Sequence, residues 1–115
     1  MKIALCHLEV SCGLQADNLK KIANAVEVAG KNGARLVITP ETAVQGYYFH
    51  RIDEERKLEE QPASYLDELR RIVKEQNLYL FLGCGEYVPD SGLHHNSCFV
   101  FAPDGSLQSR HRKIY

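Results

Sequence analysis

Residues 34–48 read ARLVITPETAVQGYY, and this stretch decides how the rest of the chain is interpreted. Its short apolar run, Leu36–Ile38, is typical of a fully buried strand. Pro40 stops that strand, because proline has no N–H to give to a sheet. The next residue is a carboxylate, Glu41. Since ligands of open α/β sheets bind beyond the carboxyl ends of the strands, Glu41 is the first candidate for chemistry.

The composition is that of an ordinary globular chain, with 115 residues, 44% apolar and 25% charged. Such a length allows one domain or less. A net charge of −1 gives no electrostatic reason to expect nucleic acid or an anionic membrane as a partner. No apolar run reaches transmembrane length, and the apolar start is too short for a signal peptide. We therefore expect a cytoplasmic protein.

The four cysteines form no C-x-x-C pair, and two of them lie inside apolar runs. We expect reduced core thiols rather than a disulfide framework or a metal site. The four are Cys6, Cys12, Cys84 and Cys98.

The first third of the chain has the pattern of a βαβ unit. A strand is predicted over Lys2–Leu8, and a helix should begin near Asp17, which can cap it. Apolar residues at helical spacing continue to a glycine-bounded end at Gly30–Gly33. The second strand, Arg35–Thr39, follows. Strand, helix and strand in about forty residues predict two parallel strands.

The remainder predicts a charged loop over Arg51–Glu60, a second helix and three strands. Pro62 suits the first turn of that helix, which ends at Asn77. The predicted strands are Leu78–Leu82, with a continuation through Glu86–Val88, then His95–Phe101 and Leu107–Tyr115.

The predicted layers are unequal. Four strands are apolar on both faces, which is typical of strands covered on both sides. Right-handed crossovers stepping in one direction place both helices on the same face, so the other face would be bare. Either two copies pack sheet on sheet, or more chain exists. Because the sequence stops within a strand, we expect residues 1–115 to be the front part of a larger domain.

Three stretches together resemble the nitrilase superfamily of carbon–nitrogen hydrolases. The first is Lys2–Cys6 with the following helix start and strand lead-in. The second is TPET, residues 39–42, followed by Gly46. The third is HNSCFVF, residues 95–101, with PDG at 103–105 and RKI at 112–114. Each motif alone is weak, but their order and spacing cover essentially the whole chain.

The resemblance implies an α/β fold, here the N-terminal half of an αββα four-layer sandwich with a mostly parallel, mixed sheet. It implies a Glu–Lys–Cys triad, in which a thiolate attacks an amide or nitrile carbon. Glu41 matches the general base and Lys113 matches the lysine that stabilises the oxyanion. The nucleophilic cysteine and a second glutamate would lie beyond this sequence. No metal and no cofactor are implied.

Other residues have competing interpretations. Tyr47 is a candidate for binding substrate beside Glu41, although tyrosines equally often serve packing. Cys84 lies between glycines, but we interpret it as a core thiol at a strand end. His94 and His95 point to opposite strand faces, so they do not suit one metal ion, and a single stacked ring is expected. Asn96 is expected to satisfy backbone groups near the site.

The sequence therefore predicts a fragment of a hydrolase that cleaves non-peptide C–N bonds, inactive alone because its cysteine is absent. The substrate would be a small amide or nitrile. Partners would be further copies or a chain supplying the missing half, since exposed sheet edges favour association. Two alternatives stay open: a catalytically dead binding or oligomerisation module, and one chain of a split enzyme.

Overall fold

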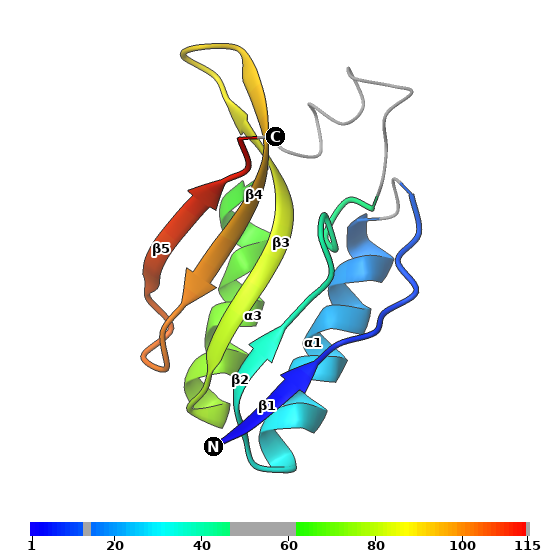
Figure 1. Cartoon of the computed structure of the whole chain (residues 1–115), viewed down its shortest axis with the longest axis vertical. Helices are drawn as coiled ribbons and strands as arrows, with labels where there is room; N and C mark the ends of the chain where they lie inside the picture. The colour runs from blue at the N-terminus through cyan, green and yellow to red at the C-terminus, as the bar shows by residue number, and fades with distance from the viewer. Residues whose placement is uncertain (13–14, 47–61, 115) are drawn as a thin grey trace.

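The computed structural model describes residues 1–12, 15–46 and 62–114. Within these ranges five strands form one mixed sheet in the order β1-β2-β3-β4-β5 (Figure 1). The three strands β1, β2 and β3 are parallel, whereas β4 and β5 are antiparallel to their neighbours. The strands are β1 (Lys2–Leu5), β2 (Ala34–Ile38), β3 (Tyr79–Val88), β4 (Leu93–Phe101) and β5 (Leu107–Arg112), and the helices are α1 (Gln15–Lys31) and α3 (Pro62–Gln76).

Both helices form where the apolar spacing predicts them. The first helix, α1, begins at Gln15, so Asp17 lies in its first turn and is not the N-cap residue. Its carboxylate there interacts favourably with the positive end of the helix dipole. After α1 the chain turns at Gly33, whose φ of +88° suits glycine. The second helix, α3, begins at Pro62 as predicted and ends before Asn77, which has a φ of +53°.

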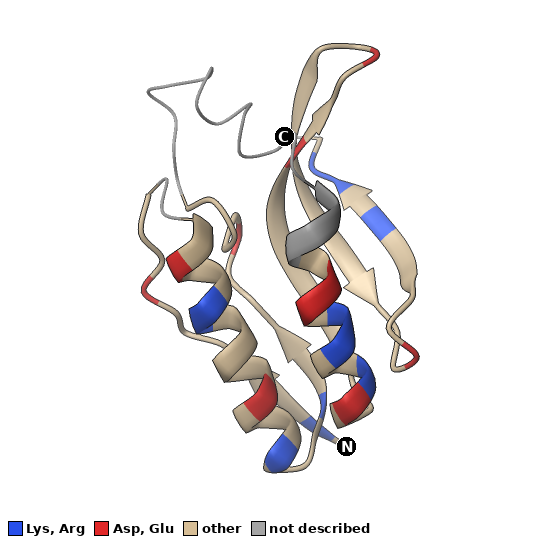
Figure 2. Ribbon diagram, turned by 180° about the vertical axis from the view of Figure 1, so that it is seen from behind, with Lys and Arg blue, Asp and Glu red and all other residues tan. Residues whose placement is uncertain are grey.

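The two helices lie side by side on one face of the sheet (Figures 1 and 2), as right-handed crossovers require. The core fills the space between this face and the helices. It contains fully buried side chains from both helices and from the central strands: Ile22, Val26, Val37, Leu69, Val73, Leu80, Leu82 and Phe101.

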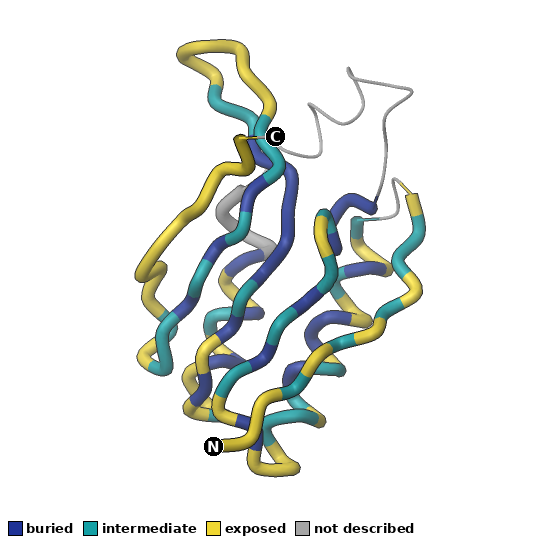
Figure 3. The backbone as a smooth tube through the Cα atoms, in the orientation of Figure 1, coloured by how far each residue is buried: buried dark blue, intermediate teal, exposed yellow. Residues whose placement is uncertain are grey.

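The opposite face of the sheet has no covering layer within the described ranges. Side chains on this face lie beside their register partners on the next strand, with Ile3 beside Leu36 and Leu5 beside Ile38. Ile3 is 50% exposed and Leu5 is 65% exposed. The prediction of one bare face is confirmed. Burial also varies across the sheet: Figure 3 shows buried residues concentrated in the central strands and exposed ones along β1 and β5.

Strand boundaries also differ from the predicted ones. The first strand ends at Leu5 rather than Leu8, and the fifth ends at Arg112 rather than Tyr115. The third runs without a break to Val88, so Gly83–Gly85 lies inside it. Local apolar character could not fix these limits, because a strand ends where its partner's hydrogen bonds end. Among the described helices, neither is long and apolar enough to cross a membrane.

Candidate active site

The turn that carries Glu41 is held closely against β3. The side-chain hydroxyl of Thr39 accepts a hydrogen bond from the Gly83 amide at 2.9 Å. A Cβ atom at Gly83 would lie 2.2 Å from the Pro40 carbonyl oxygen and 3.1 Å from the Glu41 Cα. Only glycine allows this approach, because it brings two backbones together where a side chain would collide. The glycine in β3 therefore sets the position of Glu41.

The segment after Glu41 is fixed by buried polar side chains. Thr42 has a φ of +49°, and its carbonyl accepts a hydrogen bond from the Gly46 amide at 2.7 Å. Gln45 is 1% exposed and accepts a hydrogen bond from the Gly85 amide at 2.8 Å. Asn18, fully buried on α1, donates to the Val44 carbonyl at 3.1 Å. These bonds tie the turn to both β3 and α1, so Glu41 lies on a rigid support.

Lys113 follows β5, and its side chain contacts Glu41, which follows β2. Its backbone N–H donates to the Asn96 carbonyl at 2.8 Å, which continues the β4–β5 pairing by one bond. Its Nζ lies 2.7 Å from Glu41 Oε1. The Asn96 side-chain amide donates to the same Oε1 at 2.5 Å. One carboxylate oxygen thus receives both an ammonium and an amide.

These groups line a cavity of about 260 Å³. The cavity is open on the bare side of the sheet, and β2, β3, β4 and the end of β5 contribute its walls. Besides the three polar groups above, its lining includes Phe81, Cys98 and His111. The β4–β5 register places Cys98 opposite His111. The cavity combines an apolar floor with a few convergent polar groups, which is the usual character of a small-molecule site.

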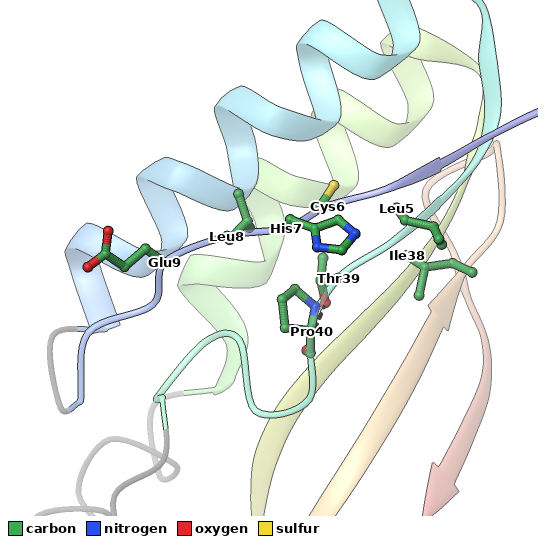
Figure 4. Close-up of a pocket in the computed structure, with 8 residues that line it drawn as sticks. All are labelled: Leu5, Cys6, His7, Leu8, Glu9, Ile38, Thr39 and Pro40. Atoms are coloured by element: carbon green, nitrogen blue, oxygen red, sulfur yellow. Dashed lines mark hydrogen bonds between the residues drawn. The ribbon is translucent and has the colours of Figure 1, made fainter.

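A second, larger hollow of about 620 Å³ lies on the other side of Pro40 (Figure 4). It is formed by the chain that follows β1 and by the end of β2. In Figure 4 the Cys6 and Leu8 side chains point toward the helices, and both pack against the core. The two hollows share Ile38, Thr39 and Pro40, so the Glu41 turn separates them.

An ion-pair cluster on the helix-covered face anchors the end of β5. Glu86, 8% exposed, accepts hydrogen bonds from Arg112 Nε at 2.8 Å and from the Ser97 hydroxyl at 3.0 Å. It also accepts a short hydrogen bond from Arg110. The Arg112 bond, together with those from Arg110 and Ser97, lowers the pKa of Glu86 from 4.5 to about 2, against the opposing effect of burial. Arg112 is thereby held on one face of the sheet, and the alternation of the strand turns Lys113 to the other.

Cys6, Cys84 and Cys98 are buried or partly buried, which is not the setting of an activated nucleophile. Within the described ranges none of them forms a disulfide. Burial raises the pKa of the Cys6 and Cys98 thiols, which disfavours the reactive thiolate. Cys84 is fully buried on the helix-covered face, as expected for a core thiol, whereas Cys12 is exposed and so contradicts that expectation.

The structure brings Glu41 and Lys113 together, although 72 positions separate them in sequence. Tyr47 and the Arg51–Glu60 segment lie outside the described residues. The centroids of the His94 and Tyr87 rings lie 4.9 Å apart, so His94 has the expected ring contact, but the planes are tilted by 42° rather than stacked. The Asn96 side chain was expected to satisfy backbone groups, but it donates to the Glu41 carboxylate instead, a contact that the sequence did not predict. The available signal was its position at the start of the fourth apolar strand, where side chains alternate between faces.

The sequence of this chain is similar to those of known proteins. The family model described as "Carbon-nitrogen hydrolase" matches residues 2–115. The chain is 37% identical over 119 residues to omega-amidase NIT2 of Mus musculus and 31% identical to that of Homo sapiens. Each match covers 99% of this chain and 40% of the relative. The chain therefore spans about two fifths of the length of these curated relatives.

Solved structures show the same fold. Nit3 of Saccharomyces cerevisiae, a member of branch 10 of the nitrilase superfamily, superposes with a TM-score of 0.83 at 26% identity, covering 98% of this chain and 44% of that one. The NitFhit protein of C. elegans gives a TM-score of 0.86 at 21% identity, covering 98% and 27%. The mixed sheet with two helices on one face is thus half of the nitrilase-type sandwich. The chain belongs to the carbon–nitrogen hydrolase family.

Proposed function

We propose that this chain supplies the general base and the oxyanion-stabilising cation of an amide-hydrolysing enzyme, and that the nucleophilic thiol comes from outside these 115 residues. The observation that carries the proposal is the 2.7 Å contact between Lys113 Nζ and Glu41 Oε1 in a cavity at the sheet edge. A carboxylate beside an ammonium is what this chemistry needs. One group moves protons, and the other stabilises negative charge.

In the proposed reaction Glu41 takes the proton of the incoming thiol, and the sulfur attacks the amide carbon. The carbonyl oxygen becomes an oxyanion that the Lys113 ammonium stabilises. Glu41 then returns the proton to the leaving nitrogen, the C–N bond breaks, and a thioester remains. A water molecule, deprotonated by Glu41, attacks the thioester, and the acid leaves as the thiol is restored.

An external thiol is supported by the setting of Cys98 and Cys84. Cys98 lines the cavity, but burial raises the pKa of its thiol. Cys84 is fully buried in the core between sheet and helices. Residues 1–115 then form a partial domain that should not hydrolyse amides alone. A primary amide is favoured over a nitrile, since relatives at 31–37% identity carry the name omega-amidase. The cytoplasmic location, self-association and the role of Tyr47 stay predictions.

The decisive experiment compares the 115-residue chain with a fusion. In the fusion, the chain is joined in frame to the part of Mus musculus omega-amidase NIT2 that it does not match. Ammonia release from small primary amides is measured for both. We expect no release from the chain alone and turnover by the fusion. Glu41→Gln and Lys113→Met should each abolish that turnover. The control His94→Ala changes a residue on the same face of β4 as Asn96, and it should leave the turnover unchanged.

Two outcomes would contradict the proposal. The first is a folded fusion whose turnover survives Glu41→Gln. The second is hydrolysis by the chain alone, whether or not it survives Cys84→Ala and Cys98→Ala, because the nucleophile would then be a group of this chain. A folded fusion without turnover would favour the alternative of a binding module.

A further inference from the structure

Asn96 contacts both groups on which the proposed chemistry depends. Its side-chain amide donates to Glu41 Oε1 at 2.5 Å, and its carbonyl accepts the Lys113 backbone N–H at 2.8 Å. The same Oε1 lies 2.7 Å from Lys113 Nζ. The three residues therefore form a closed ring of contacts, in which Asn96 binds the Glu41 side chain and the Lys113 backbone.

The sheet fixes Asn96 in this position from both sides. On β3 its register partner is Gly85, whose amide and carbonyl are also bound by Gln45 of the Glu41 turn. The next residue, Ser97, faces the helices and donates to buried Glu86. Since neighbouring side chains on a strand point to opposite faces, anchoring Ser97 directs Asn96 to the bare face and into the cavity.

We propose that Asn96 is a positioning residue, which holds the Glu41 carboxylate against the Lys113 ammonium and keeps it oriented toward the cavity. The inference rests on the proposed function of Glu41 and Lys113. An amide suits this role because it donates a hydrogen bond but neither gains nor loses a proton near neutral pH. It can therefore orient the base at every stage without competing for the proton that the base carries.

The role has a consequence that scaffolding alone would not produce. A hydrogen bond donated to a carboxylate favours its charged form, so losing the Asn96 amide should make Glu41 easier to protonate. Among the described residues, the other titratable groups that line the cavity are Lys113 and His111, which come from the β5 end, and Cys98 from β4. The β3 residues of the lining, Phe81 and Gly83, do not titrate.

The test uses the 115-residue chain with its glutamate side chains labelled with ¹³C at the carboxyl carbon. Carboxyl shifts are followed by NMR as the pH is lowered, and the Glu41 signal is the one missing from Glu41→Gln. We expect Asn96→Ala to raise the Glu41 midpoint by about one pH unit. Asn96→Asp should raise it further, because a second carboxylate then faces the first. His94→Ala, two positions earlier on the same face, should leave it unchanged.

A parallel arm measures the pH profile of kcat/KM in the fusion with the NIT2 remainder. There Asn96→Ala should shift the acidic limb upward by the same amount as the NMR midpoint and lower kcat. An unchanged Glu41 midpoint in folded Asn96→Ala would overturn the inference, whether or not the fusion is active. An inactive fusion with a shifted midpoint would instead contradict the proposed function and leave the positioning role supported.

Discussion

Gly83→Ala tests whether the position of Glu41 depends on the close approach of its turn to β3. The added Cβ would lie 2.2 Å from the Pro40 carbonyl oxygen, 3.0 Å from the Thr42 nitrogen and 3.1 Å from the Glu41 Cα. Ordinary contacts begin at 3.4 Å, so the Pro40 carbonyl must retreat by about 1.2 Å. All three neighbours are backbone atoms, so the collision cannot be relieved by rotating a side chain.

The displacement falls directly on the candidate site. Overpacking of this kind costs about 1–3 kcal/mol of unfolding free energy. A movement of about 1 Å would carry Glu41 Oε1 beyond hydrogen-bond range of Lys113 Nζ, from which it now lies 2.7 Å. A misplacement of about 1 Å at a reacting group lowers the rate by about 10²-fold. We therefore expect a modest loss of stability together with a large loss of turnover.

The assay combines urea unfolding of the chain, followed by circular dichroism, with ammonia release by the fusion to the NIT2 remainder. Gly92→Ala is the matched control. Gly92 has a φ of +67°, but a Cβ atom added there would meet no atom of the described residues within 4 Å. That variant should lose about 1 kcal/mol through backbone strain and keep its turnover. The reasoning is refuted if Gly83→Ala, compared at equal folded fraction, turns over amides as fast as Gly92→Ala.

Two further predictions concern stability and thiol exposure. Glu86→Gln should lower the unfolding free energy at pH 7 by about 2 kcal/mol, a value reduced by the partial exposure of Arg110 and Arg112. Urea titrations of the unchanged chain and of the variant will measure this difference. Because the pKa of Glu86 is about 2 in the folded chain and ordinarily 4.5, this difference should be complete above about pH 4.5 and shrink toward pH 2; a constant difference would contradict it. Cys12 should react first with a thiol reagent and Cys84 only on unfolding, so early loss of Cys84 in mass-spectrometric mapping would argue against the core packing.

Much of the fold followed from local patterns. The apolar spacing of α1 and α3, the turn glycine Gly33 and Pro62 at a helix start are properties of neighbouring residues, so they could be predicted without knowing the tertiary structure. The parallel pairing of β1 and β2 followed equally, because a strand–helix–strand sequence permits one crossover hand. Glu41 was located by its place after a buried strand.

Other features depend on contacts between distant segments. One bare face was predicted, but the apolar residue types of β1 did not show that Ile3 and Leu5 would lie on it, since exposure depends on which layer covers the sheet. The tight fit of Gly83 under Pro40 could not be predicted from either segment alone.

Residue types at short range were enough to predict the order of the helices and strands, the family resemblance and the candidate acid and lysine. Two features required the folded chain: Asn96 donates to Glu41 across 55 positions, and Glu86 anchors the strand leading to Lys113. The physical reason is strand register. The pairing of β3, β4 and β5 selects which side chains share a face, and a shift of one residue would turn each of them away from the site.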